Sequence, residues 1–66
     1  MKIVLNGREQ DVDSGATIAD LIAASGLAGK RVAIEVNREI VPRSDYAARR
    51  LRADDRVEVV QAIGGG

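Results

Sequence analysis

The residues of this chain that could take part in chemistry are the three glycines at its end, Gly64, Gly65 and Gly66. Glycine has no Cβ and no side-chain charge, and its backbone is freer than that of any other residue. Such a segment could thread a narrow channel and present the α-carboxylate of Gly66 to the active site of another protein. The alternative is a frayed end without function, because chain termini are often poorly ordered. The glycines alone leave both interpretations open.

The rest of the chain lacks the side chains that most enzymes use. Its 66 residues include no cysteine and no histidine. Disulfides, thiolate nucleophiles, histidine acid–base catalysis and the usual zinc sites are therefore excluded. We predict that the protein is not an enzyme, that it binds no metal and no cofactor, and that it takes part in chemistry as a substrate or carrier.

Charge and composition narrow the kinds of partner. Ten Lys and Arg balance ten Asp and Glu, so the net charge favours neither nucleic acid nor a membrane surface. The single aromatic residue, Tyr46, offers no platform for stacked bases. The apolar run over residues 3–5 is too short for a signal peptide, and no stretch is long enough to span a membrane. These observations predict a cytoplasmic protein.

Arginines gather between residues 43 and 56, interleaved with Asp45, Asp54 and Asp55. This pattern favours a solvated face with surface ion pairs of little energetic weight. A second interpretation is a patch that steers an acidic partner.

The beginning of the chain predicts a β-hairpin. Residues 2–6 alternate, with Ile3 and Leu5 on one face, as in a half-buried strand. Asn6-Gly7 favours a type I′ turn, because both residues tolerate positive φ. A second strand should return over residues 8–12.

One helix should follow a turn at residues 13–15. Thr17 can accept a hydrogen bond from the backbone of Asp20, whose carboxylate can reach back to Thr17 in a capping box. Gly26 suits the left-handed conformation that ends a helix. Apolar residues at helical spacing should face the sheet, and they are Ile18, Leu21 and Ile22.

The second half of the chain predicts three more strands. Residues 31–37 alternate, and so do residues 57–63, which form the closing strand. A short strand around Ile40-Val41 should end at Pro42, which cannot donate a ladder hydrogen bond. The turn at Asn37-Arg38 is either bulged or of type I′, because arginine tolerates positive φ less well than glycine.

The segment before the closing strand should contain a short 3₁₀ or helical turn at residues 44–46. Ala47 and Leu51 should pack inward after it, and Asp54-Asp55 should make the last turn.

This order of elements makes the fold class α+β, because a single amphipathic helix must cover one face of one sheet. It matches the ubiquitin-like β-grasp, a mixed sheet of four or five strands with one main helix packed on one face. In that arrangement the first and last strands lie parallel in the middle of the sheet. Residues 1–62 would then form the β-grasp domain, and residues 63–66 a flexible Gly-rich tail.

Four sequence features together resemble one family. They are Asn6-Gly7, Val36-Asn37 followed by Ile40-Val41-Pro42-Arg43, the run over residues 55–60, and the ending Ala62-Ile63-Gly64-Gly65-Gly66. Over essentially its whole length the chain resembles the ThiS family, the sulfur carriers of thiamine biosynthesis. The Val-Pro-Arg element at this distance before a terminal Gly-Gly is fairly specific. The family often has Gly at the position of Arg38, Trp at Tyr46, and Gly-Asp at Asp54-Asp55.

The resemblance implies a reactive carboxylate on Gly66. An E1-like adenylating enzyme, similar to ThiF, would use Mg-ATP to convert it to an acyl-adenylate. A sulfur donor protein would then displace AMP and leave a thiocarboxylate, which would give its sulfur to thiazole synthase, similar to ThiG. Gly64 and Gly65 would give access to a narrow channel, and an enclosed site would limit hydrolysis of the intermediate.

The sheet face away from the helix is a candidate docking surface. It should carry Val4, Ala33, Val60 and Ala62, with Val4 and Val60 as near neighbours on the two central strands. Such a face is normally polar, so exposed valines beside the tail could hold a partner. The alternative is ordinary strand propensity with scattered apolar surface residues, and the sequence leaves the two level.

Other functions fit part of the pattern. The small subunit of molybdopterin synthase and the ubiquitin-like protein modifiers share the terminal Gly-Gly. A plain binding module with an incidental glycine tail is a further class. The short chain and the Val-Pro-Arg element favour the thiamine pathway.

Overall fold

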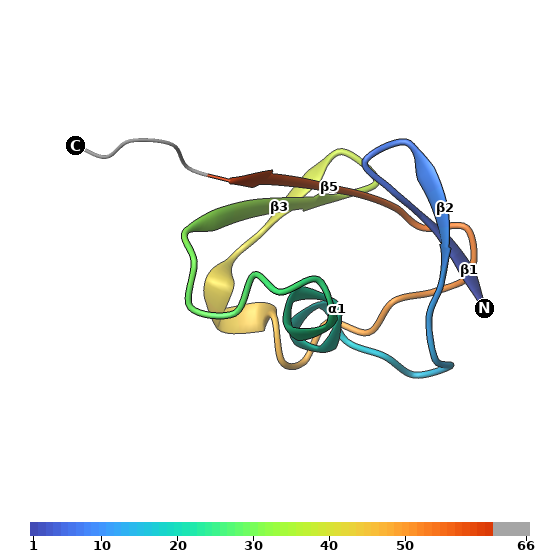
Figure 1. Cartoon of the computed structure of the whole chain (residues 1–66), viewed down its shortest axis with the longest axis horizontal. Coiled ribbons are helices and arrows are strands. Elements are labelled where there is room, and N and C mark those ends of the chain that lie inside the picture. Colours follow the sequence, from blue (N-terminus) through green and yellow to red (C-terminus); the bar gives the residue numbers. More distant parts are fainter. Residues whose placement is uncertain (62–66) are drawn as a thin grey trace.

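The computed structural model describes residues 1–61 as one five-stranded mixed sheet with an α-helix on one face (Figure 1). The elements in chain order are β1 (Lys2–Leu5), β2 (Arg8–Asp11), α1 (Ile18–Ala24), β3 (Val32–Val36), β4 (Glu39–Val41), the 3₁₀ helix η1 (Arg43–Asp45) and β5 (Arg56–Gln61). The strand order is β2-β1-β5-β3-β4. β5 runs parallel to β1 and antiparallel to β3, as the sequence predicts for the first and last strands. Over these residues no helix has the length and hydrophobicity of a membrane span.

Both hairpins use two-residue turns in the left-handed conformation. Asn6 and Gly7 have φ values of 50° and 82°, and Asn37 and Arg38 have values of 52° and 69°. Positive φ at both central residues is the mark of a type I′ turn, whose twist matches that of the flanking strands. The second turn is therefore not bulged, and Arg38 adopts a conformation that is costly for a residue with a Cβ.

The predicted capping box starts α1. The backbone N–H of Asp20 donates to Thr17 Oγ1 at 3.2 Å, and the backbone N–H of Thr17 donates to Asp20 Oδ2 at 2.9 Å. The helix ends as predicted, with Gly26 at a φ of 74° and the N–H of Leu27 donating to the carbonyl of Ile22 at 3.0 Å. These caps matter because a seven-residue helix has few internal hydrogen bonds of its own.

The core lies between α1 and the sheet. Its buried side chains come from both layers and from the segment that follows η1: Ile3, Ile18, Leu21, Ile34, Val36, Val41, Leu51 and Val57. Tyr46 packs against this cluster, whereas Ala47, predicted to point inward, is exposed. The reason is that Tyr46 fills the inward position of this turn, so its immediate neighbour faces solvent.

Candidate functional site

The predicted reactive residue Gly66 lies outside the residues that the structure describes, as do Gly64, Gly65 and Ala62. The structure describes the strand that leads to them. β5 runs through the sheet between β1 and β3, and its last residue, Gln61, lies opposite Val32 at the start of β3 (Figure 1). The described part of β5 therefore ends beside the start of β3.

Two asparagines hold β5 from opposite sides. β1 ends at Leu5, and beyond it the side-chain oxygen of Asn6 accepts the N–H of Val59 at 2.8 Å. β3 ends at Val36, and beyond it the side-chain oxygen of Asn37 accepts the N–H of Arg56 at 3.0 Å. The turn residues that make the hairpins thus also extend the pairing of the central strand.

Asp55 completes the attachment of β5. Its carboxylate is only 6% exposed and accepts hydrogen bonds from Asn37 Nδ2 at 3.0 Å and from the N–H of Arg52 at 2.8 Å. The prediction that Asp55 belongs to a solvated charged face is therefore wrong. Both carboxylate oxygens have a partner, which is what allows the charge to be buried.

The prediction of surface ion pairs around the arginines of residues 43–56 is also wrong for the described part of the chain. There, the one ion pair joins Lys2 to Glu9 at 3.8 Å on the exposed surface. The arginine side chains of that segment are thus left without a carboxylate partner among residues 1–61.

The predicted neighbours Val4 and Val60 do not meet. Val4 is half-buried and pairs with Arg56, so Val60 lies four residues further along β5, or about 13 Å at the usual rise of a strand. Val60 is 59% exposed and lies opposite Ala33 of β3. The error arises because β1 pairs with the beginning of β5 and ends before Val60 is reached.

A revised apolar surface on the open face includes a residue that the sequence pattern did not single out. Ile40 of β4 is 75% exposed and pairs with Glu35 of β3. Glu35 lies two residues after Ala33 and on the same face of the sheet. The alternation of β4 could have indicated the exposure of Ile40, because Val41 is buried and its neighbour must face the other way. We call Ala33, Ile40 and Val60 the open-face patch. It borders on the carboxylates of Glu35 and Glu58, which are cross-strand partners.

Metal binding finds no support in the described residues. Among residues 1–61, no group of three or more Cys, His, Asp or Glu side chains is placed to hold a metal ion.

Comparison with known proteins finds relatives that point to one family. The model of the ThiS family matches residues 3–66. The sulfur carrier protein ThiS of Bacillus subtilis is 39% identical over 64 residues, which is 94% of this chain and 96% of the relative.

Two longer relatives are named thiazole synthase. Those of Magnetococcus marinus and Paramagnetospirillum magneticum are 44% and 41% identical to the whole chain. In each case the match covers 20% of the relative, so the chain spans about a fifth of the length of these proteins.

A solved structure matches over its full length. The crystal structure of the thiamine biosynthesis protein ThiS from Geobacter metallireducens superimposes with a TM-score of 0.84 and 29% identity, covering 100% of both chains. This likeness confirms the α+β, ubiquitin-like β-grasp fold predicted from the sequence.

Proposed function

Because the chain belongs to the ThiS family, we propose that it is a sulfur carrier in the formation of the thiazole ring of thiamine. The observation that carries the proposal is the family match, which spans residues 3–66 and so includes the glycine tail. The likeness to a sulfur carrier over nearly the whole length of both chains supports it. The family expected from the sequence is thereby confirmed.

The chemistry takes place at the carboxylate of Gly66. A carboxylate is a poor electrophile until one oxygen becomes part of a good leaving group. In an adenylating enzyme with Mg-ATP, the carboxylate oxygen bonds to the α-phosphorus and pyrophosphate leaves. The terminal sulfur of a donor persulfide then attacks the carbonyl carbon and AMP leaves. A thiol cleaves the resulting acyl disulfide, is oxidised to a disulfide, and frees the thiocarboxylate.

In this proposal the chain presents the carboxylate of Gly66 to its partner enzymes and contributes no catalytic side chain. Gly64 and Gly65 let the tail enter an enclosed site, where a side chain would meet the walls and where water is kept from the acyl-adenylate. The strand before the tail is held on both sides by the sheet and by Asn6 and Asn37. The tail therefore follows a strand whose position in the sheet is fixed.

Thiazole synthase is the proposed recipient of the sulfur. Two proteins of that name include a stretch that is more than 40% identical to this whole chain. A carrier-like sequence and a thiazole synthase sequence thus occur within one polypeptide, which supports their joint action. The adenylating enzyme and the sulfur donor protein complete the proposed set of partners.

Intact mass spectrometry tests the proposal. We expect the wild-type protein, incubated with its adenylating enzyme, Mg-ATP and a persulfide donor, to gain the mass of one O-to-S exchange. Deletion of Gly66 should abolish the gain, and Gly65→Val should slow it by roughly a hundredfold, because a small misplacement of a reacting group has that effect.

The matched control is Ala53→Val, which adds side-chain atoms at an exposed position of a distant turn and should react normally. Circular dichroism should show the same fold for all variants. A wild-type protein that gains no mass under these conditions contradicts the carrier function. Higher-mass conjugates on a denaturing gel would instead indicate a protein modifier.

A further inference from the structure

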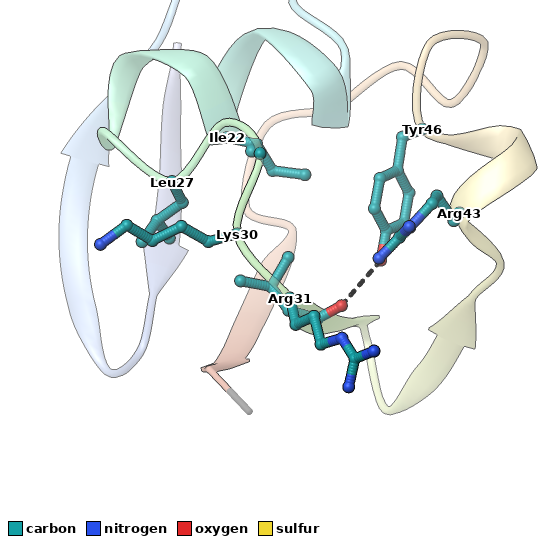
Figure 2. A pocket seen from close by; sticks show the side chains of 8 residues that line it. Ile22, Leu27, Lys30, Arg31, Arg43 and Tyr46 are labelled. Atoms are coloured by element: carbon teal, nitrogen blue, oxygen red, sulfur yellow. Dashed lines mark hydrogen bonds between the residues drawn. The ribbon is translucent and has the colours of Figure 1, made fainter. Parts of the chain in front are cut away.

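A hollow with a basic rim lies on the helix side of the sheet (Figure 2). The open-face patch lies on the other face of the sheet. We call this hollow the basic hollow. It has a volume of about 440 Å³ and lies between the end of α1, the start of β3 and η1. Its lining consists of Ile22, Leu27, Gly29, Lys30, Arg31, Val32, Arg43 and Tyr46.

The hollow combines an apolar floor with positive charge. Ile22, Leu27, Val32 and Tyr46 are half-buried, and the Tyr46 hydroxyl donates to the Val32 carbonyl at 3.4 Å. Figure 2 shows the Lys30 ammonium on one side and the guanidinium groups of Arg31 and Arg43 on the other. The lining includes no carboxylate side chain from the described residues, and the three cations are exposed.

The linings of two hollows on either side of α1 differ in charge, although the net charge of the chain is zero. A second hollow, between α1 and β2, is lined by Asp11, Asp13 and Asp20 and by no cation from the described residues. The basic hollow therefore suits an acidic partner better than the second hollow does. This difference orients an encounter even without net charge.

The exposure of the basic hollow favours a protein segment over a small ligand. Small-molecule sites bury most of the ligand surface. Here the cations are exposed and the apolar residues are half-buried, so a small anion would stay largely in water, where ion pairs are weak. A protein segment covers the hollow with its own bulk and excludes water from the ion pairs. Guanidinium groups such as Arg31 and Arg43 suit carboxylates, which they can bind through two parallel hydrogen bonds.

The hollow is also close to the start of the tail. Val32, which lines it, pairs with Gln61, the last described residue of β5. The hollow therefore lies beside the end of the described part of β5, within reach of an enzyme that binds the residues after Gln61.

We propose that the basic hollow is the docking surface for an acidic segment of thiazole synthase. An apolar side chain of that segment packs on Leu27 and Tyr46, and flanking carboxylates pair with Arg31 and Arg43. The proposal rests on the proposed function, in which both the adenylating enzyme and thiazole synthase bind the tail. Of these two partners, thiazole synthase is the one whose name is borne by two relatives that contain a stretch similar to this chain.

Charge reversal tests the proposal by calorimetric titration of the carrier into the thiazole synthase of the same organism. Arg31→Glu combined with Arg43→Glu should raise Kd at least about tenfold at low salt, which corresponds to about 1.4 kcal/mol. The matched control, Arg8→Glu with Arg52→Glu, changes the net charge equally at exposed positions outside the hollow. It should leave Kd within about threefold, because distant surface charges are screened.

A second pair of variants guards against misfolding. Arg31→Gln with Arg43→Gln removes charge without repulsion, and it should flatten the rise of Kd with salt that the wild type shows. Equal weakening by the hollow and control variants would overturn the proposal, because it would indicate non-specific charge. Normal binding of the hollow variants would also overturn it, as would a loss confined to the adenylating enzyme.

Failure of the docking proposal can be told apart from failure of the proposed function. The function is tested by the mass gain of the wild-type protein, which involves no change in the hollow. Suppose that the wild-type protein gains sulfur and that the hollow variants bind thiazole synthase normally. That result would contradict the docking proposal and leave the proposed function intact.

Discussion

At the scale of single residues, Asp55 ties the segment before β5 to the turn after β3. One carboxylate oxygen accepts from Asn37 Nδ2 and the other from the N–H of Arg52, and the group is buried. Asn37 in turn accepts the N–H of Arg56. The three hydrogen bonds fix the point at which β5 enters the sheet, and hence the strand that carries the tail.

Replacing Asp55 with asparagine should destabilise the fold more than its small change in shape suggests. The new NH₂ group must face one of the two donors, so one buried donor loses its acceptor, at a cost of roughly 1–3 kcal/mol. Urea unfolding followed by circular dichroism measures the effect.

The neighbouring Asp54→Asn is a matched control. Asp54 is exposed at a φ of 69°, a conformation that asparagine tolerates well, so its free energy of unfolding should change by less than about 0.5 kcal/mol. Equal effects of the two substitutions would mean that the hydrogen bonds of Asp55 contribute nothing measurable.

At the scale of elements, the two hairpin turns have the same backbone conformation but different sequences. The turn between β1 and β2 has glycine at its second position, Gly7, whereas the turn between β3 and β4 has Arg38 there. An L-residue with a side chain is disfavoured by roughly 1–2 kcal/mol in this conformation. The second hairpin therefore forms against a local strain that the pairing of β3 with β4 and β5 must offset.

Arg38→Gly should stabilise the protein by about 1 kcal/mol, because the strain is removed while glycine adds some entropy to the unfolded chain. The reciprocal change, Gly7→Ala, should destabilise it by about 1 kcal/mol for the same reason. A Cβ at Gly7 would meet no atom of the rest of the fold within 4 Å, so that cost comes from the local backbone conformation and not from a clash with packed neighbours. Thermal unfolding measures the melting temperature of both variants. Shifts of the same sign in the two variants would contradict the explanation.

At the scale of the whole molecule, two different surfaces flank the strand that leads to the tail. The open-face patch of Ala33, Ile40 and Val60 is apolar, and the basic hollow lies on the helix side. β3 contributes to both, because its residues alternate between the two faces of the sheet. Partners that handle the same tail can therefore recognise different sides of the domain.

Aspartate on the open-face patch should impair thiocarboxylate formation without unfolding the domain. Ile40→Asp and Val60→Asp place a charge at exposed apolar positions and should each lower the rate about tenfold if the adenylating enzyme buries this patch. Ala53→Asp, at an exposed position away from the patch, is the matched control. If folded variants form the thiocarboxylate at the wild-type rate, Ile40 and Val60 contribute only to strand formation and not to docking.

Local signals made most of the fold predictable from the sequence. Strand alternation, the capping box of Thr17 and Asp20, and the turn dipeptides each depend on residues close in the chain. They specify elements whose order restricts the topology to few choices. The match of this order to the ubiquitin-like β-grasp then indicated the parallel pairing of the first and last strands.

Features that depend on distant residues were predicted poorly. The register between Val4 and β5 joins positions more than 50 residues apart, and no local pattern specifies it. The burial of Asp55 depends on Asn37, which only the folded sheet brings near. Of the candidate site, the exposure of Val60 agrees with the sequence, whereas the glycines lie outside the described residues.

The position of β5 between β1 and β3 has a mechanical consequence. A partner that draws the tail into its channel pulls along the axis of β5. The hydrogen bonds to β1 and β3 lie across that axis, so the pull loads them together in shear instead of opening them one after another. An edge strand such as β4 has a neighbour on one side only. The domain can thus resist a pulling force on its tail without β5 detaching from the sheet residue by residue, starting at the pulled end.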